Sequence, residues 1–396
     1  MYDRLKSTRF TVFLIVLLDI MGLGLIIPSQ PFLAKSFGAH PGTITLLGTV
    51  YSLMQFGLSP VWGSLSDRFG RRPILLCTIL LTFIGHCAFA LSSTLLMLFV
   101  ARAAAGIGAA NISTAQAVLS DTHPAAERSR AMAMIGAAFG LGFVFGPALG
   151  GLLFQLDHRA PAGFAALLSA LNMVLVYFTL AETRPALIEH KSGHLSFLKF
   201  LQSDGSLRQL LLTTLLTMTA FALMEHSVGL FIESVWVPAN NPDSMTKATT
   251  LTSIFMVVVG ISAVFVQGFL VRRWLKTTSE TKLFRFGLIT IAFGLILIPS
   301  LGWVGSYPLF LISGAFLALG SGMFNPSMAG LVSLACPAHR QGLGLAMNQS
   351  ASALGRIIGP TFAGILFLSG VQMPFIVGGL LTCLALGLST RIKVSR

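Results

Sequence analysis

Long apolar runs recur along this chain and restrict its fold more than any other feature. Between residues 10 and 390 they follow one another with only short polar breaks. An apolar helix of about 20 residues is long enough to cross a lipid bilayer. Only 10% of the residues are charged, against about 25% in an ordinary soluble domain, so the chain could not cover itself with polar surface in water. The sequence predicts an all-α integral membrane protein.

Breaks at charged residues, Pro and Gly divide the chain into twelve apolar segments. They lie near 10–34, 43–64, 74–92, 95–117, 131–155, 162–181, 209–234, 248–270, 283–300, 306–334, 341–368 and 372–390. The polar head "MYDRLKSTRF" precedes an apolar segment too long for a signal peptide, so we expect it to stay as the first span. The longest polar stretch, 182–208, follows the sixth segment. We expect six-helix bundles over 1–181 and 209–396, joined by this linker.

Basic residues are distributed unequally between the two sides of the predicted membrane. The termini and the loops on their side contain 21 Lys and Arg, whereas the opposite loops contain only Lys35, Arg159 and Lys247. Cytoplasmic loops of membrane proteins are enriched in Lys and Arg. We therefore expect both termini and the linker in the cytoplasm. The same rule accounts for the net charge of +13 without a nucleic-acid partner.

The two halves of the chain resemble each other. Residues 106–154 align with residues 320–367 with a single-residue gap, so that Asn111 falls on Asn325 and Gly146 on Gly359. Chance similarity of Gly-rich helices is the alternative, but the register holds across two helices and a loop. A duplicated six-helix unit is typical of alternating-access transporters, which bind their substrates near the bilayer midplane between the halves.

Four motifs link this chain to a known family. The loop "GSLSDRFGRRP" (63–73) resembles the signature loop of the major facilitator superfamily, and "RAAAGIGAA" (102–110) resembles its fourth-helix motif. The segment "GAAFGLGFVFGPALGG" (136–151) resembles the fifth-helix motif of antiporters, and "DIMGLGLIIPSQP" (19–31) resembles the first helix of tetracycline and multidrug exporters. The resemblance covers essentially the whole chain. It implies the major facilitator fold, with two pseudo-symmetric six-helix bundles, and the activity of a drug:proton antiporter.

The resemblance assigns a gate to the loop between the second and third spans. The expected gate residues are Gly63, Asp67, Arg68, Gly70, Arg71, Arg72 and Asp121. We expect Gly63 and Gly70 to permit a tight backbone, and Asp67 to meet the partially positive N-terminus of the eleventh span. The family implies a pair between Arg71 and Asp121 that holds the cytoplasmic side shut. For Arg68 and Arg72, membrane topology alone is an alternative explanation.

The fifth span has a stripe of small residues. It contains Gly136, Gly140, Gly142, Gly146, Pro147, Gly150 and Gly151. Small residues four positions apart let membrane helices approach closely, and Gly-Pro weakens the helix locally. Plain close packing explains such a stripe, whereas the family implies a seal against the eighth span that prevents leak.

Ionisable side chains within spans are costly and usually functional. Asp19 in the first span is the first candidate for the proton-coupling acid, with a structural ion pair as the alternative. Glu225 in the seventh span is the second candidate, unless it lies at the outer rim. Arg102 resembles the fourth-helix arginine that influences proton release, and His226 is a possible relay beside Glu225. We expect His86 to be a packed neutral histidine.

The substrate cavity is expected to be mostly apolar, because 31 Phe and 15 Met suit adaptable binding of lipophilic molecules. Its polar candidates are Gln55, Asn111, Gln116, Asn348, Gln349 and Arg356. The four cysteines lack metal-ligand spacing and no phosphate-binding loop is present, so we expect no cofactor, no metal and no enzymatic activity.

The sequence thus favours a proton-coupled exporter of lipophilic or cationic small molecules. By resemblance it works as a monomer in the bacterial inner membrane, with protons, a small molecule and the lipid bilayer as its partners. A facilitator or proton symporter for a metabolite such as a sugar is the alternative within transport. A membrane enzyme or receptor would need a catalytic cluster or a soluble domain, which the short loops do not provide.

Overall fold

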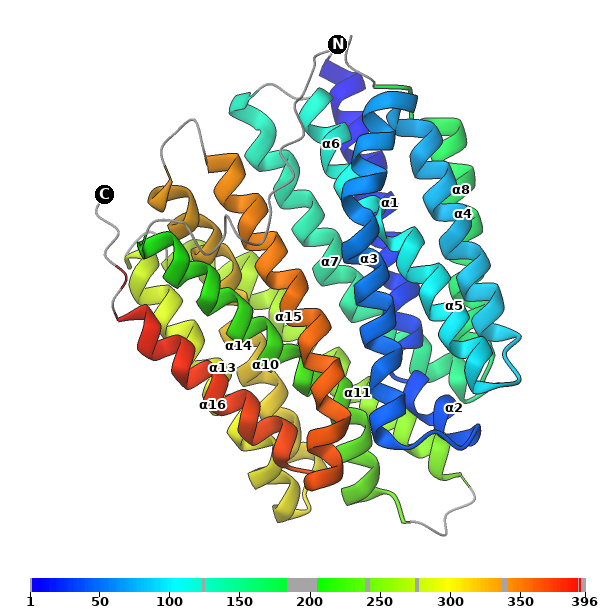
Figure 1. The fold of residues 1–396 in the computed structure, drawn as a ribbon, viewed down its shortest axis with the longest axis vertical. Coiled ribbons are helices and arrows are strands. Elements are labelled where there is room, and N and C mark those ends of the chain that lie inside the picture. Colours follow the sequence, from blue (N-terminus) through cyan, green and yellow to red (C-terminus); the bar gives the residue numbers. More distant parts are fainter. Residues whose placement is uncertain are drawn as a thin grey trace. The chain divides into compact units, whose positions relative to one another are not determined.

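The computed structural model describes residues 2–122, 125–183, 205–238, 243–274, 278–336, 341–390 and 392. In these residues the regular structure is entirely helical (Figure 1). Eleven helical segments are long and apolar enough to span a membrane, and a twelfth, Met373–Ser389, is shorter. Each of the twelve predicted spans overlaps one of these segments, which confirms the predicted all-α membrane architecture.

In the part of the chain that the structure describes, nine helical pieces precede the linker and a tenth follows it. They are α1 (Tyr2–Ile26), α2 (Gln30–Ser36), α3 (Pro41–Phe69), α4 (Arg71–Ala90), α5 (Leu95–Gly108), the 3-10 turn η1 (Ala109–Asn111), α6 (Ile112–Thr122), α7 (Ala125–Phe154) and α8 (Ala160–Thr179), followed after the linker by α10 (Gly205–Trp236). The predicted fourth span is therefore α5, η1 and α6 in succession. Most of the predicted linker, 184–204, lies outside the described residues.

The second half continues with seven further pieces. They are α11 (Ser244–Phe265), the π-helical turn η2 (Val266–Leu270), α12 (Val271–Trp274), α13 (Glu280–Val304), α14 (Tyr307–Ala335), α15 (Gln341–Ser369) and α16 (Met373–Ser389). The predicted eighth span, 248–270, covers most of α11 and ends at the last residue of the π-helical turn.

Proline positions explain several helix boundaries. A proline stands in the first turn of α2, α3, α8, α14 and α16, where its missing N–H leaves no helical hydrogen bond unmade. The predicted first span, 10–34, ends earlier than expected, at Ile26. Pro28 follows, and the residue before a proline is disfavoured in the helical region. The chain therefore turns over residues 27–29 and restarts as the short α2.

The chain divides into two compact units that differ slightly from the predicted bundles. One unit comprises residues 1–40, 50–192 and 245–257, and the other comprises residues 41–49, 193–244 and 258–396. The start of α3, residues 41–49, thus belongs to the second unit, and the first part of α11, residues 245–257, belongs to the first unit. Thr45 Oγ1 accepts a hydrogen bond from the Gly364 amide, and Thr49 bonds Thr361, which ties the start of α3 to α15. The predicted boundaries follow the sequence repeat and stay a prediction.

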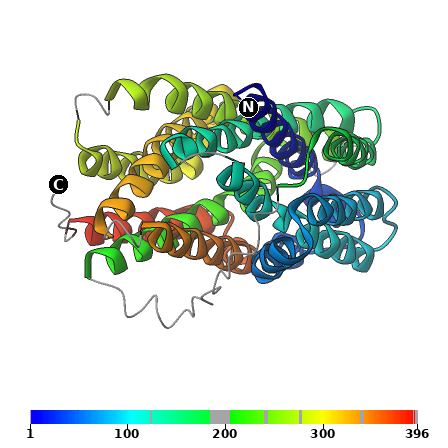
Figure 2. The same ribbon diagram turned by 90° about the horizontal axis from the view of Figure 1, so that it is seen from above.

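The pairing of helices repeats from one unit to the other. In the first unit α1 packs against α7 and α8, while α4 packs against α5 and α8. In the second unit α10 packs against α15 and α16, while α13 packs against α14 and α16. These are corresponding helices of the predicted repeat, and Figure 2 shows the same helices from above. The internal duplication of the sequence is therefore also a duplication of packing.

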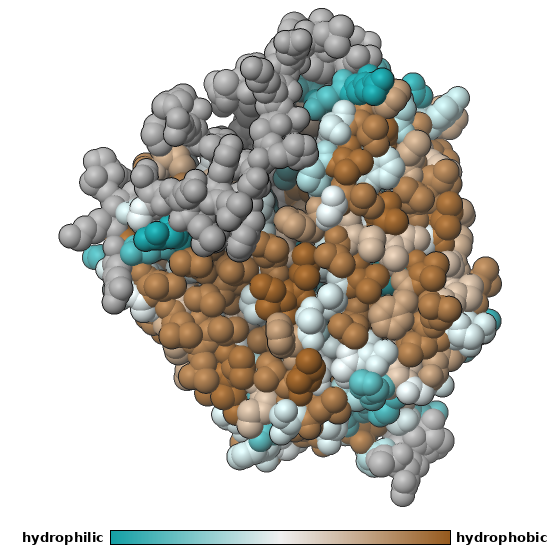
Figure 3. All heavy atoms as spheres, in the orientation of Figure 1, coloured by the Kyte–Doolittle hydropathy of each residue, from teal (hydrophilic) through white to brown (hydrophobic). Residues whose placement is uncertain are grey.

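Apolar side chains cover the outer helix faces. Large hydrophobic residues such as Ile84, Leu171 and Leu380 are exposed on α4, α8 and α16. Figure 3 shows hydrophobic side chains over the middle of the visible face, with hydrophilic ones gathered toward the helix ends. A soluble protein rarely exposes contiguous apolar surface of this kind. These faces are suited to lipid, whose hydrocarbon core requires apolar contacts and helices with internally satisfied backbones.

Candidate functional site

The turn between α3 and α4 is built around Gly70. Its φ of +105° is a conformation that side-chain-bearing residues rarely adopt, so glycine is required there. The expectation for Gly63 is wrong: this residue lies inside α3, and a Cβ added to it would meet no heavy atom within 4 Å. The tight backbone of the loop therefore depends on Gly70.

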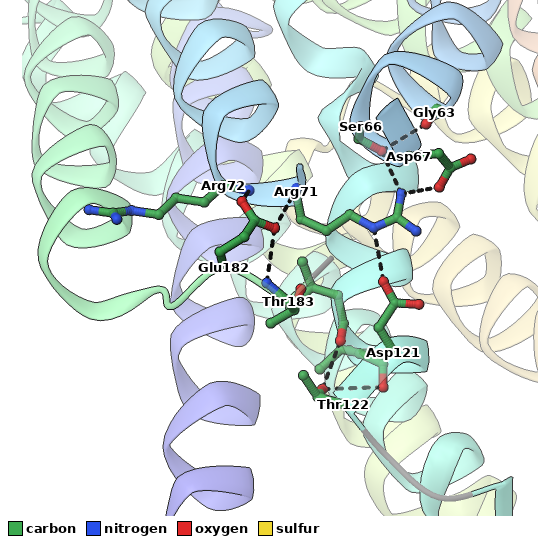
Figure 4. A network of polar contacts seen from close by, with 11 residues as sticks. Gly63, Ser66, Asp67, Arg71, Arg72, Asp121, Thr122, Glu182 and Thr183 are labelled. Carbon is green, nitrogen blue, oxygen red and sulfur yellow. Dashed lines mark hydrogen bonds and ion pairs between the residues drawn. The ribbon is translucent and has the colours of Figure 1, made fainter. Parts of the chain in front are cut away.

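Arg71 is the centre of the polar cluster at this turn (Figure 4). Although it is charged, only 6% of its surface is exposed. Its Nη1 lies 2.5 Å from Asp67 Oδ1 and 2.6 Å from Ser66 Oγ, and its Nε lies 2.9 Å from Asp121 Oδ2. The Arg71–Asp121 pair implied by the resemblance is therefore present. A buried charge needs such partners, because an uncompensated charge in the interior is strongly destabilising.

Glu182 belongs to the same cluster, although the sequence indicated it only as a linker charge. Its Oε1 accepts a hydrogen bond of 2.8 Å from the Arg71 amide, and its Oε2 accepts one of 3.3 Å from the Arg72 amide. A Cβ on Gly70 would lie 2.5 Å from Glu182 Oε2. The carboxylate thus binds the free N–H groups at the start of α4, where the helix dipole favours negative charge.

Arg68 and Arg72 are not members of the two ion pairs made by Arg71. Arg72 Nη2 donates a 2.5 Å hydrogen bond to the Tyr177 carbonyl of α8, and its guanidinium lies 5.2 Å from the Tyr177 ring centroid. Arg68 is exposed and stacks over Phe69. Asp67 pairs with Arg71, and its expected contact with the eleventh span stays a prediction, since the two belong to different units.

Asp19 is held by two amide side chains from other helices. Asn111 Nδ2, in the η1 turn, donates to Oδ2 of Asp19, and Asn172 Nδ2, in α8, donates a 2.8 Å hydrogen bond to Oδ1. Asn172 is fully buried and also donates to the Ile15 carbonyl at 3.1 Å. Both carboxylate oxygens of Asp19 thus face donors. Asn172 was not among the residues that the sequence indicated. Asn111 binds Asp19, and its expected place in the substrate cavity stays a prediction.

Arg102 and His86 are buried in the same unit. The Arg102 guanidinium lies 4.3 Å from the ring centroid of Tyr51, a cation–π arrangement that joins α5 to α3. His86 Nδ1 lies 3.1 Å from Ser169 Oγ, and its ring lies 3.0 Å from where a Cβ of Gly22 would be. His86 therefore packs against α1 at Gly22, about one turn beyond Asp19.

The two proton-coupling candidates of the second unit, Glu225 and His226, are less buried than Arg102 and His86. Glu225 is half-buried in α10. His226 Nδ1 lies 3.1 Å from the Ala222 carbonyl oxygen, and the ring fills the space beside Gly48, where an added Cβ would overlap it. Neighbouring residues on a helix do not face each other. The proposed relay from Glu225 to His226 stays a prediction.

The glycine stripe of α7 faces α1 more than α11. Cβ atoms added at Gly142, Gly146 and Gly150 would meet Ile20, Gly24 and Leu25 of α1 at 2.6, 2.8 and 2.5 Å. Gly151 faces α11, since its Cβ would lie 2.5 Å from Ser253. Most of the stripe that was expected to seal against the eighth span therefore provides close packing with the first. Gly136 lies among residues whose side-chain surroundings are not described.

The remaining cavity candidates have mixed surroundings. Gln55 Nε2 donates to the Ala109 carbonyl at 3.1 Å, and Asn348 Oδ1 accepts a 2.7 Å hydrogen bond from Thr214 Oγ1. Gln116 is half-buried, whereas Gln349 and Arg356 are exposed. The substrate cavity stays a prediction. Among the described residues, no group of three or more His, Cys, Asp or Glu is placed to hold a metal ion.

The family model described as "Major Facilitator Superfamily" matches residues 12–304 and 241–393 of the chain. This chain belongs to the Major Facilitator Superfamily. The match confirms the resemblance seen in the motifs, and it makes the chain a membrane transporter and not an enzyme. The Asp19 and Arg71 clusters therefore lie within a transporter fold.

Curated relatives cover nearly the whole chain. The class C tetracycline resistance protein of Escherichia coli is 30% identical, over 92% of this chain and 92% of its own length. The class B tetracycline resistance protein of Escherichia coli is 28% identical, over 91% and 88%. The multidrug resistance protein 2 of Bacillus subtilis (strain 168) is 28% identical, over 96% and 94%.

Solved structures share the fold. The human organic anion transporter MFSD10 (TETRAN) superposes with a TM-score of 0.73 at 25% identity, over 97% of this chain and 99% of that one. A bacterial homologue of the human lysosomal transporter Spinster superposes with a TM-score of 0.77 at 14% identity, over 98% and 97%. These structures confirm the predicted major facilitator architecture.

Proposed function

We propose that this chain exports lipophilic or cationic small molecules, drugs among them, in exchange for protons. The observation that supports this most strongly is the full-length similarity to tetracycline and multidrug resistance proteins. These relatives favour export over the alternative of a facilitator or symporter for a metabolite. The transporter works by alternating access between two six-helix halves, as a monomer in the bacterial inner membrane, with both termini and the linker in the cytoplasm.

Asp19 is the proton-coupling residue in this proposal. Its carboxylate lies within α1, receives hydrogen bonds from Asn111 and Asn172, and has no ion-pair partner among the described residues. Two donors suit the ionised carboxylate, since hydrogen bonds to charged groups are roughly twice as strong as neutral ones. Protonation turns one oxygen into a donor, so a facing amide must rotate to present its oxygen. Proton uptake is thereby joined to a rearrangement between α1, η1 and α8. Glu225 is the second candidate.

The Arg71 cluster is the proposed gate. Arg71 joins the end of α3, through Asp67, to the end of α6, through Asp121. Glu182 fixes the start of α4 between them. The arrangement holds three helix ends in one geometry, so a movement of any of them changes the pairing of a buried charge.

A drug panel tests the function. The chain is expressed in a bacterium that lacks its own efflux pumps, and growth inhibition is measured for lipophilic cations, tetracyclines and uncharged metabolite analogues. We expect raised resistance to at least one drug class and substrate-induced proton release from everted vesicles. Resistance to no compound, together with accumulation of a sugar, would support the facilitator instead.

A further inference from the structure

An apolar groove runs between α4 and α8 on the outer face of the first unit. It has a volume of about 350 Å³, within the range of about 300–1,000 Å³ for small-molecule sites. Its lining consists of Leu76, Cys77 and Leu80 of α4 with Met173, Val174 and Phe178 of α8, together with Tyr177. Phe178 is 78% exposed. The groove therefore opens toward the lipid and not toward the interior of the bundle.

Arg72 stands beside this groove. It occupies the first turn of α4, and its guanidinium lies over the ring of Tyr177, a lining residue. Figure 4 shows its side chain extending away from Arg71 and the ion pairs. A guanidinium has five N–H donors. Within the described part of the chain one of them is bound, by the Tyr177 carbonyl, and the buried Nε has no acceptor. The charged guanidinium thus lies over a residue of the groove and has further N–H donors on its two terminal nitrogens.

We propose that the groove binds an acyl chain of an anionic phospholipid whose phosphate is held by Arg72. The groove offers hydrocarbon contacts along two helices, and an arginine fork matches the geometry of a phosphate. Arg72 also lies at the right depth relative to the bilayer surface, because α4 begins at Arg71. Basic residues and tyrosines at the ends of membrane-spanning helices lie at the level of the lipid headgroups. Basic side chains at this level attract anionic lipids.

The lipid site goes beyond the transport activity proposed above, and its occupant touches neither Asp19 nor Asp121. It has a structural link to the gate, however. Arg71 and Arg72 are consecutive, and Glu182 binds both of their amides. A phosphate bound to Arg72 therefore contacts the first turn of α4, which also positions Arg71.

The native cysteines provide a test with a matched control. Cys77 lines the groove, whereas Cys383 is an exposed cysteine of α16. Cys77 is six residues from the start of α4 and Cys383 is six residues from the end of α16, so each lies about 9 Å from its helix end. Both ends lie on the same side of the predicted topology. The two thiols therefore experience the same surface potential of the bilayer.

Single-cysteine forms of the full chain are prepared with Ser at the other three positions and reconstituted into nanodiscs. The lipid is phosphatidylcholine alone or an equal mixture with phosphatidylglycerol, and the rate of alkylation by N-ethylmaleimide is measured. We expect phosphatidylglycerol to slow alkylation of Cys77 several-fold more than that of Cys383. Arg72→Gln should remove this difference, and Arg72→Lys, which keeps the charge but not the fork, should keep only part of it. Arg273→Gln, at an exposed arginine of the second unit, should leave the difference unchanged.

Equal slowing at both cysteines, or protection that survives Arg72→Gln, would overturn the proposal. Protection in both lipids, with cross-linking between Cys77 residues of two chains, would instead assign the groove to a second copy. Protection only on addition of a transported drug would assign it to substrate. Both results contradict a lipid site. Val174→Trp fills the groove and leaves the residue at 72 unchanged, and intact-mass measurement should show less retained phosphatidylglycerol on this variant than on the wild-type protein.

Discussion

At the scale of single residues, Asp19 has the most direct consequence for function. Asn cannot take up or release a proton, so Asp19→Asn should abolish uphill efflux in proteoliposomes under an imposed pH gradient. Downhill exchange of substrate should survive. Asp19→Glu keeps a titrating group at a shifted position and should retain partial activity. Undiminished accumulation by Asp19→Asn would transfer the coupling role to Glu225, whose Gln variant should then fail the same assay.

The donors to Asp19 provide a second prediction. Asn172→Ala removes a hydrogen bond to Oδ1 and leaves the Ile15 carbonyl without this donor. A hydrogen bond to a charged group contributes about 1.5–3 kcal/mol. We expect uphill efflux to fall on the order of tenfold or more, with protein amount in the membrane largely retained. Asn172→Asp, similar in shape, replaces the donor by a second acid and should reduce efflux further; activity equal to wild type in both variants would remove Asn172 from the coupling site.

The ion pair at the gate predicts a partial rescue. Arg71→Asp places a third acid beside Asp67 and Asp121, and Asp121→Arg places two arginines together. Breaking a buried pair costs about 3–5 kcal/mol, so each single reversal should reduce efflux at least tenfold. The double reversal restores one attractive pair and should regain several-fold activity in everted vesicles, short of wild type because Asp67 then faces an acid. A double variant no better than either single one would show that the pair does not act as a unit.

At the scale of helices, small residues determine which pairs approach closely. A Cβ at Gly146 would lie 2.8 Å from the Gly24 Cα of α1, and one at Gly359 would lie 2.5 Å from the Ala222 Cβ of α10. Gly146→Leu and Gly359→Leu should each destabilise the protein by about 1–3 kcal/mol through overpacking, seen as a lower unfolding temperature in detergent. Gly57→Ala, where added atoms meet open space, is the control. A loss at one glycine without a loss at the other would mean that the two halves are not energetically equivalent.

Much of the architecture follows from the sequence at this scale, whereas the side-chain partners do not. Apolar run length places the twelve spans, and the Gly146–Gly359 alignment indicates which helices correspond. Pro28 shows why the first span is short, since the apolar run continues past a residue that ends the helix. Glu182 and Asn172 could not be assigned, because they act on residues about 110 and 150 positions away. Such contacts depend on which helices pack together, which run length and composition do not specify.

At the scale of the whole molecule, the distribution of charge determines orientation. Positive residues are concentrated on the side of the termini, and moving this many of them across the membrane is disfavoured. We predict that a cysteine in place of Ser192, in the linker, is not labelled by an impermeant maleimide in intact cells. His158→Cys, in the exposed turn after α7, should be labelled from outside and serves as the matched control in a cysteine-free background. Helix α7 connects Asp121 to the turn at residue 158, and α8 connects that turn to Glu182, so the turn and the Arg71 cluster lie at opposite ends of these helices. The two labels therefore also show on which side of the membrane the Arg71 cluster lies. Labelling at 192 with none at 158 would reverse the orientation, and the arginine cluster would then face the outside, where it could not close a cytoplasmic entrance.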